Sequence, residues 1–481
     1  MSHPPLSKLS LDALYTLLRP VTLSASDPRS HFINWGLSYE CRPLTVFEPE
    51  NEHQCELILE LARREGQSVR AAGVGHSPSD LACTSGFMLR TEKLSKIIEI
   101  NEDKRYVIAQ GGVSLNALHV ALAEHNLAMI NVGSISDQTL AGVVTTATHG
   151  TGMDFKVIST HVMSLTLLLA DGSRVRCSRQ DYPELFTASL CGLGSTGLIL
   201  QIQLEVGPGF RLKETQESLP FASAVDNLQE IATASEHVRL WWFPQADTIR
   251  VSSADRTSEP RTPHATFLWH SLIGYHLVQL LLFLGRYLPS INSYICYFCV
   301  WLDRSKAVAV DDSWRVFNID CKYPQYTTEW AIPFEQTSSC LNQLRDWLEE
   351  EQADPHGLRP HFPIEIRFSD ADDVWLSPSF GRKTTWIGIV QYKPYGCNVP
   401  YRKLFERFEG ILARHKGRPH WAKSHPLRPH DLRTLYPHFD DFVHVLEEVD
   451  PNGIFRNEYV ERHIFDKRGP GFDGRVFKRF R

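Results

Sequence analysis

This 481-residue sequence has no excess of basic residues, no cysteine spacing typical of a disulfide framework, and few long apolar runs. With a formal net charge of -6 and a pI near 6.4, the chain lacks the cationic field that binds a phosphate backbone, so nucleic acid is not an expected partner. The ten cysteines are scattered, and the first residues, MSHPPLSKLS, lack the apolar core of a secretory signal. We therefore expect reduced thiols and an intracellular protein that is not secreted.

The most apolar segment, residues 277–302, reads LVQLLLFLGRYLPSINSYICYFCVWL. Gln279, Arg286, Pro289 and Asn292 interrupt the run of about 18 apolar residues that a membrane-spanning helix requires. We expect peripheral contact with a membrane surface here, and the alternative is a buried helix of a second domain.

The rest of the composition is that of a folded globular protein, because 42% of the residues are hydrophobic and 22% are charged. A chain of this length predicts two or three domains. We predict an α+β fold with these parts: an N-terminal extension (1–31), a glycine-rich domain (32–208), a second domain with Trp-rich strands (209–414), a C-terminal segment (415–465) and a basic tail (466–481).

Gly192, Gly194 and Gly197 have the GxGxxG spacing of dinucleotide-binding loops, but their context differs. In that fingerprint the glycines follow a strand and open a helix. Here they follow a predicted helix at 184–189 and precede the strand-like stretch 198–206. We interpret them as close-packing turns, and a nicotinamide dinucleotide is not the expected cofactor.

His76 lies in the loop AAGVGHSPSD (71–80), directly after a predicted strand. The flanking Gly73 and Gly75 would let a planar ring or a phosphate approach the backbone closely. An imidazole in such a place can act as a base, a metal ligand or a covalent tether, whereas most lone loop histidines only make surface hydrogen bonds. The motif alone leaves these alternatives open.

A second candidate site is the strand-like stretch HFPIEIRFSD (361–370). Its two-residue period places the carboxylate of Glu365 and the guanidinium of Arg367 on the same face. Such a pair most often forms a solvated ion pair on a sheet surface. In a cavity, the two groups would instead bind sugar hydroxyls and stabilise developing negative charge.

The stretch GRPHWAKSH supplies His420 and Lys423 near the C-terminus. His415, His420 and His425 are evenly spaced, but this spacing matches no zinc motif and includes no cysteine. No metal site is therefore predicted.

Five motifs follow one another along the chain: GVGHSPSD (73–80), GSISDQTLAG (133–142), TATHGTG (146–152), EIR (365–367) and RPHWAK (418–423). Together they resemble the aldonolactone oxidoreductases of the vanillyl-alcohol-oxidase-type flavoproteins, most of all the fungal D-arabinono-1,4-lactone oxidases and next the L-gulono-1,4-lactone oxidases. The resemblance implies a two-part PCMH-type FAD-binding domain over 32–208. It also implies an α+β cap domain over 209–414 for the substrate, and a segment over 415–465 that returns to the flavin.

The resemblance assigns roles to individual residues. His76 is implied to bond covalently, through its ring nitrogen, to the 8α-methyl group of FAD, which would make the flavin a stronger oxidant. Further cofactor-binding residues are implied to be Gly73, Gly75, Ser77, Ser134, Ser136, Asp137, Gly142, Thr148, Gly150 and Gly152. The implied catalytic residues are Glu365, which binds substrate hydroxyls, Arg367, which stabilises the anionic reduced flavin, and Lys423 and His420 beside the flavin.

The implied reaction is oxidation of the C2 hydroxyl of an aldono-1,4-lactone, with D-arabinono-1,4-lactone favoured. A hydride passes from C2 to the flavin, the keto lactone becomes an enediol such as erythroascorbate, and O2 becomes H2O2. Alternatives are an L-gulono-1,4-lactone oxidase, a lactone dehydrogenase with a carrier acceptor, and a non-catalytic sugar-binding membrane protein. The resemblance further implies a mitochondrial membrane location.

Overall fold

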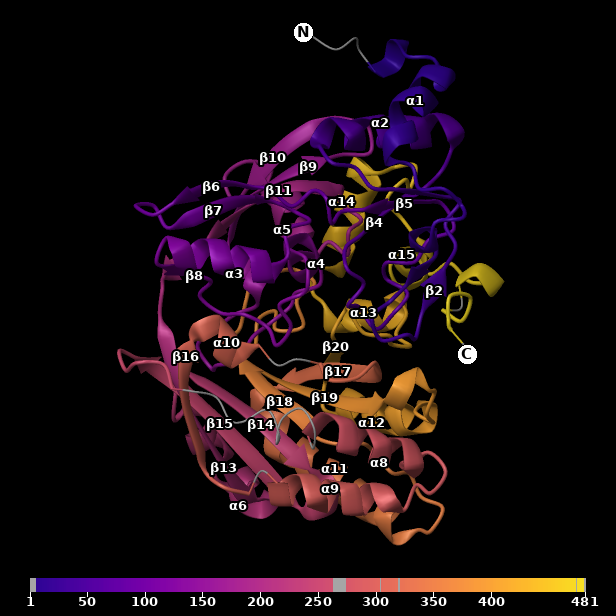
Figure 1. The fold of residues 1–481 in the computed structure, drawn as a ribbon. Helices are drawn as coiled ribbons and strands as arrows, with labels where there is room; N and C mark the ends of the chain where they lie inside the picture. The colour runs from indigo at the N-terminus through magenta and orange to yellow at the C-terminus, as the bar shows by residue number, and fades with distance from the viewer. Residues whose placement is uncertain (1–5, 263–273, 303, 319–320, 473, 480–481) are drawn as a thin grey trace.

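The computed structural model describes residues 6–262, 274–302, 304–318, 321–472 and 474–479. Two lobes stand one above the other in Figure 1. The N-terminal third of the chain forms the upper lobe, and the middle of the chain forms the lower lobe around a broad sheet. The C-terminal helices lie back in the upper lobe, among segments from the start of the chain.

The N-terminal lobe is built on two sheets. A parallel sheet has the strand order β3-β5-β4, and an antiparallel sheet has the order β10-β9-β11-β7-β6. Their strands are β3 (Thr45–Phe47), β4 (Val69–Ala72), β5 (Phe87–Arg90), β6 (Ile97–Asn101), β7 (Tyr106–Gln110), β9 (Val162–Leu168), β10 (Arg174–Ser178) and β11 (Leu198–Glu205). Two short pairs join β1 (Phe32–Ile33) to β2 (Glu40–Cys41) and β8 (Leu127–Ala128) to β12 (Gly207–Pro208).

Three of the five α-helices that the structure describes in this lobe begin at a residue whose side chain caps the first turn, namely Ser10, Asn51 and Ser114. The five helices are α1 (Leu11–Leu18), α2 (Glu52–Glu65), α3 (Leu115–Glu124), α4 (Leu140–Thr145) and α5 (Pro183–Ser189). Ser114 caps α3, because its Oγ accepts the Ala117 amide hydrogen. Gly66 ends α2 with a φ of +64°, a left-handed conformation that glycine adopts without strain.

The glycines at 192, 194 and 197 lie between α5 and β11, so the predicted helix-to-strand order is confirmed. The Arg70 guanidinium donates hydrogen bonds to the carbonyls of Leu193 and Gly194. This loop is therefore packed against the protein's own buried arginine, as expected of a close-packing turn.

The second lobe is built on an eight-stranded antiparallel sheet with the order β16-β13-β15-β14-β18-β19-β17-β20. The strands are β13 (Arg211–Pro220), β14 (His237–Phe243), β15 (Thr248–Thr257), β16 (Ala307–Asp312), β17 (Gln325–Pro333), β18 (Ile364–Ser369), β19 (Thr384–Tyr392) and β20 (Arg418–Pro419). One apolar core joins this sheet to α6 (Phe221–Asp226), α7 (Leu228–Thr233), α11 (Thr337–Ala353) and α12 (Arg402–Arg414). Short α10 (Ser313–Phe317) follows β16.

The apolar segment 277–302 forms two short helices, α8 (Val278–Gly285) and α9 (Ile291–Leu302). One side of the pair is buried in a small core with Phe243 and Tyr323. The other side exposes large apolar groups, including Tyr287 at 69% and Tyr294 at 73% exposure. Across the residues that the structure describes, no helix combines the length and hydropathy needed to cross a membrane.

The C-terminal segment contributes α13 (Pro429–Leu435), α14 (Phe439–Val449) and α15 (Glu458–His463), whose apolar faces share the main core of the N-terminal lobe. The basic tail that follows packs against residues near the start of the chain. Phe477 is buried, its carbonyl accepts the Glu40 amide hydrogen, and the Arg479 amide donates to the carbonyl of Ser38. Arg481, also counted in the basic tail, lies outside the described residues.

We predict that Glu409, on α12, makes stability depend on pH. Thr328 Oγ1 donates a hydrogen bond to its carboxyl group at 2.7 Å, and burial raises the pKa of Glu409 from 4.5 to about 7. A raised folded-state pKa gives stability that is complete below pH 4.5 and is lost as the pH rises through 7. Glu409→Gln should therefore raise the free energy of unfolding at pH 8, by at most about 3 kcal/mol, and leave it nearly unchanged at pH 4.

Thermal or urea unfolding at the two pH values checks this prediction. Glu350→Gln, at an exposed position on α11, is the control and should show no pH-dependent gain. An equal change in the free energy of unfolding at pH 4 and pH 8 would contradict a raised pKa of Glu409 in the folded protein.

Candidate functional site

A single buried carboxylate, that of Glu329 on β17, lies at the centre of the site. Arg367 Nη2 on β18 donates to its Oε1 at 2.8 Å, and Lys423 Nζ lies 3.5 Å from its Oε2. His149 Nε2, from the loop after α4, lies 3.2 Å from Oε1. We call these four residues the Glu329 cluster. Its members come from both lobes and from the C-terminal segment.

The strand register explains why these side chains meet. Glu329 on β17 and Glu365 on β18 both lie opposite Gly388 of the intervening strand β19. Residues directly opposite one another point to the same face, and a glycine between two acids leaves room on that face. Arg367, two residues beyond Glu365, projects from the same face, as the sequence period predicts.

Burial and pairing together set the charges of the cluster. Burial alone would raise the pKa of Glu329, but Arg367, Lys423 and His149 hold that pKa well below its usual value, so the carboxylate stays ionised. Burial would lower the pKa of Arg367, yet Glu365 and Glu329 raise it overall. Two cations on one carboxylate leave one net positive charge.

His420 is neutral and has a defined tautomer. Burial, reinforced by Lys423, lowers the pKa of His420 well below its usual value. Its Nδ1 accepts the Ala422 amide hydrogen at 3.1 Å, so the ring proton of the neutral form resides on Nε2. His420 therefore acts as a hydrogen-bond donor toward the site and is not placed to accept a proton at Nε2.

Glu365 is the more accessible acid of the face. Its side chain is 29% exposed, and its Oε2 lies 3.5 Å from Arg367 Nε. The prediction that Glu365 and Arg367 share one face of the strand is thus confirmed, whereas their catalytic roles stay a prediction. Arg239 on β14 lies opposite Arg367 and is buried, where it donates to two backbone carbonyls of α10. Glu365 therefore stands near two guanidinium groups.

The His76 loop is fixed at both ends by other segments. Trp35 donates its amide hydrogen to the Gly75 carbonyl, and Ser79 Oγ donates to the Ala422 carbonyl at 2.9 Å. The His76 ring stacks on Trp35 with centroids 5.4 Å apart, and its buried Nδ1 has no hydrogen-bond partner among the described residues. Burial lowers the pKa of His76; Asp137 opposes this shift and Lys423 adds to it.

The segment 134–152, which carries two of the sequence motifs and includes α4, contacts the Glu329 cluster. Arg367 Nη1 lies 3.4 Å from Ser134 Oγ and 3.4 Å from the His149 carbonyl oxygen. The Gly152 amide donates to the Phe368 carbonyl on β18. These contacts bring Ser134 and Gly152 against the sheet face that carries Glu365.

The other predicted cofactor residues differ in whether they already form hydrogen bonds within the protein. Asp137 accepts a hydrogen bond from Asn116, the Ser77 carbonyl accepts one from Asn34, and the Gly142 carbonyl accepts one from Thr146. Ser136 Oγ is buried without a partner among the described residues. The further positions, all in or beside these loops, are Gly73, Thr148 and Gly150.

The arrangement suits FAD chemically. Two polar atoms, His76 Nδ1 and Ser136 Oγ, are buried and unsatisfied among the described residues, as expected where a ligand supplies the partner. The loops that carry them consist of small residues whose backbone can approach a ring or a pyrophosphate. The excess positive charge of the Glu329 cluster faces the same region.

A metal is poorly suited to this site. Ligand atoms of His149, Glu329 and His420 lie within 4.8 Å of one another. However, the one carboxylate among them is already paired with Arg367 and Lys423, whose charges would repel a metal ion. The evenly spaced histidines do not assemble: His415 hydrogen-bonds to Gln343 on α11, and the His425 ring packs at a tilt against His463.

Sequence reasoning missed Glu329, His149 and Arg239. Glu329 is a lone acid in an otherwise apolar strand end, TTEWAIP, which is a usable signal for a buried functional carboxylate. His149 lies inside the motif TATHGTG, but no role was assigned to it. Arg239 could be linked to Arg367 only through the pairing of β14 with β18.

Comparison with known proteins first defines the class. A family described as "FAD binding domain" matches residues 43–178, which identifies the chain as a flavoprotein. A cholesterol oxidase from B. sterolicum has the same fold, with a TM-score of 0.75 at 15% identity, covering 92% of this chain and 99% of that one. A solvent-stable cholesterol oxidase gives a TM-score of 0.72 at 20% identity, covering 89% and 96%. The fold is therefore the expected α+β PCMH-type architecture.

The particular family follows from the second half of the chain. A family described as "D-arabinono-1,4-lactone oxidase" matches residues 202–463, and this chain belongs to it. An L-gulonolactone oxidase from Scyliorhinus torazame is 37% identical over 90% of this chain and 98% of its own length. A D-arabinono-1,4-lactone oxidase from Kluyveromyces lactis is 28% identical, covering 84% and 86%. An L-gulono-1,4-lactone dehydrogenase from Mycobacterium tuberculosis is 31% identical, covering 89% and 98%.

We predict that Glu329 positions Arg367 and Lys423. Glu329→Gln removes the charge that holds both cations, which should cost about 3 kcal/mol of unfolding free energy because two buried cations lose their counter-charge. The displaced cations should lower kcat about 100-fold while FAD remains bound. Urea unfolding, the flavin absorbance spectrum and steady-state kinetics measure the three quantities.

Glu335→Gln provides the matched control, since Glu335 is exposed six residues further along. It should leave all three quantities unchanged. A Glu329→Gln enzyme with normal kcat would show that the cluster only stabilises the fold.

Proposed function

We propose that this protein oxidises the C2 hydroxyl of an aldono-1,4-lactone with FAD and O2, giving a dehydro-lactone that forms an enediol, and H2O2. The observation that carries the proposal is the sheet face on which Glu365, Arg367 and Lys423 meet the His76 loop. D-arabinono-1,4-lactone, which would yield erythroascorbate, is the substrate we favour from the motifs and the matching family. The identity to L-gulonolactone oxidases supports L-gulono-1,4-lactone as the alternative.

When bound, FAD accepts the hydride from the substrate carbon and passes two electrons to O2. The protein's own residues would bind and orient the lactone and move its proton. Glu365, partly exposed on the sheet face, would accept hydrogen bonds from the sugar hydroxyls. Arg367 and Lys423, held by Glu329, would supply fixed positive charge where negative charge accumulates during the reaction.

The proton of the C2 hydroxyl needs an acceptor. Glu329 is a poor one, because its two cationic partners hold its pKa well below the usual value. His420 already uses its Nδ1 as a hydrogen-bond acceptor from Ala422. The acceptor we propose is the Glu365 carboxylate, because it lies on the same face and its side chain is 29% exposed, which leaves it open to a ligand.

The proposal is tested with an oxygen electrode, a peroxide assay and a panel of aldonolactones. We expect O2 uptake with one H2O2 per lactone oxidised. Glu365→Ala and Arg367→Ala should each lose roughly 3 kcal/mol or more of transition-state stabilisation, measured from kcat/KM. Near-normal turnover in either variant would reject the role given to that residue.

Two alternatives give different outcomes in the same assay. A dehydrogenase with a carrier acceptor is favoured by the relative of that name, and would oxidise lactone with a dye acceptor but release little peroxide. A non-catalytic sugar-binding protein would contain no flavin and oxidise no lactone.

We also propose that His76 is the covalent attachment point of FAD. The support is its place in a glycine-rich loop, its burial and its unpartnered Nδ1. The purified protein should keep its yellow colour in the pellet after acid precipitation, and His76→Ala should lose it to the supernatant. Flavin absorbance of the two fractions measures the difference. Acid-stable flavin in His76→Ala would refute the tether.

Peripheral membrane contact through residues 277–302 is a further part of the proposal. The exposed apolar groups of α8 and α9 support it, because large clustered apolar side chains on a surface mark interaction sites. The mitochondrial location that we propose rests on the family resemblance alone. Subcellular fractionation that finds the protein wholly in a soluble fraction would contradict both statements.

A further inference from the structure

A cavity of about 470 Å³ lies beside the apolar helix pair of the second lobe. It is lined by the end of α8 with the start of α9, by residues 357–361, by Gln391 of β19, and by residues 399–404 at the start of α12. No acidic side chain occurs among its lining residues, whereas Arg286, Arg359, Arg402 and Lys403 all contribute. The lining therefore favours an anionic over a cationic ligand.

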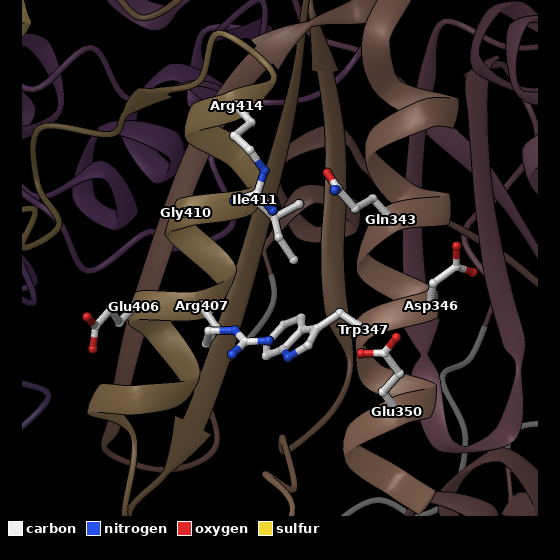
Figure 2. Close-up of a pocket in the computed structure, with 9 residues that line it drawn as sticks. All are labelled: Gln343, Asp346, Trp347, Glu350, Glu406, Arg407, Gly410, Ile411 and Arg414. Atoms are coloured by element: carbon white, nitrogen blue, oxygen red, sulfur yellow. The ribbon is translucent and has the colours of Figure 1, made fainter.

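A second depression provides a contrast. The groove of about 530 Å³ between α11 and α12 carries both signs of charge. Figure 2 shows Asp346 and Glu350 on one side and Arg407 and Arg414 on the other. Such a mixed lining favours no ligand charge.

The cavity also offers a buried group that lacks a partner. Asn292 lines its wall and is 4% exposed, and its Oδ1 has no hydrogen-bond partner among the described residues. Such an acceptor is satisfied by a hydroxyl group. Lys403, at the exposed rim, makes no hydrogen bond or ion pair to a described residue. The site thus provides cations for an anion and an acceptor for a hydroxyl.

The position of the cavity indicates the source of the anion. Arg286 and Pro289 line it, and between them in the chain Tyr287 and Leu288 are among the exposed apolar residues. The same turn therefore supplies both a wall of the cavity and part of the apolar surface. Leu358 and Val399 add apolar walls inside. A ligand that joins an anionic, hydroxylated head to an apolar tail would match both surfaces at once.

We propose that this cavity binds the headgroup of an anionic glycerophospholipid that carries hydroxyl groups, while α8 and α9 contact the acyl region of the bilayer. The phosphate lies among Arg286, Arg402 and Lys403, and a headgroup hydroxyl donates to Asn292 Oδ1. The inference rests on the proposed membrane contact and adds a lipid class to it. It makes no use of the Glu329 cluster, so lactone oxidation is independent of it.

Vesicle flotation of the purified flavoprotein tests the inference. The probes are phosphatidylcholine vesicles and phosphatidylcholine vesicles that contain phosphatidylglycerol. We expect tighter binding to the second kind, and Lys403→Glu should reduce that binding roughly fivefold or more without changing binding to pure phosphatidylcholine. Lys104→Glu, on the exposed turn between β6 and β7 of the other lobe, is the matched charge control and should have little effect.

The outcomes separate the possible explanations. Equal losses for Lys403→Glu and Lys104→Glu would overturn the headgroup site in favour of general electrostatic attraction. Binding to both vesicle kinds with equal affinity would overturn the site but keep the membrane contact, and binding to neither would overturn both. If inorganic phosphate binds to the protein and Lys403→Glu weakens that binding, while vesicles with and without phosphatidylglycerol bind equally, the ligand is a free anion and the proposed lipid is wrong. Lactone oxidation should be normal in both variants, because neither lysine belongs to the Glu329 cluster. Absence of lactone oxidation in the unmodified protein would contradict the catalytic proposal and not the headgroup site.

Discussion

The site depends on one buried carboxylate that holds two cations. Glu329 contacts both Arg367 and Lys423, and these three residues lie on β17, on β18 and in the C-terminal segment. An isolated charge at this depth would be strongly unfavourable, and the positive charge in excess within these three residues is met by Glu365, whose Oε2 lies 3.5 Å from Arg367 Nε. The geometry of the cluster therefore couples the sheet of the second lobe to the chain that returns to the first.

The two lobes contribute different chemistry at their junction. The N-terminal lobe supplies loops of small residues around His76 and residues 134–152, which suit a flat, phosphate-bearing cofactor. The second lobe supplies a sheet face with fixed charge. The two-residue period of β18 places Glu365 and Arg367 on this face, and Gly388, opposite Glu365, has no side chain to fill the space beside it. Rigid strands are better suited than loops to hold charged groups in place.

The sequence predicted those parts of the molecule that depend on local patterns. The alternation around Glu365 acts within a few residues, and it predicted correctly that Glu365 and Arg367 share a face. Ser114 and Gly66, which begin and end helices, are local signals of the same kind. Residues whose role depends on long-range pairing could not be found in this way. The sequence shows Glu329 only as a lone acid before an apolar strand end, and its pairing with Arg367 follows from the register of β17 and β18 on the two sides of β19. The tail likewise pairs with residues 38–40 far earlier in the chain.

The contacts of the loop after His76 have a consequence for biosynthesis. Asp80 forms a buried ion pair with Arg462, and Asn457 donates hydrogen bonds to the carbonyls of Leu81 and Cys83. These partners are synthesised almost four hundred residues after the loop itself. The loop can therefore gain these contacts only after the chain has been synthesised as far as Arg462.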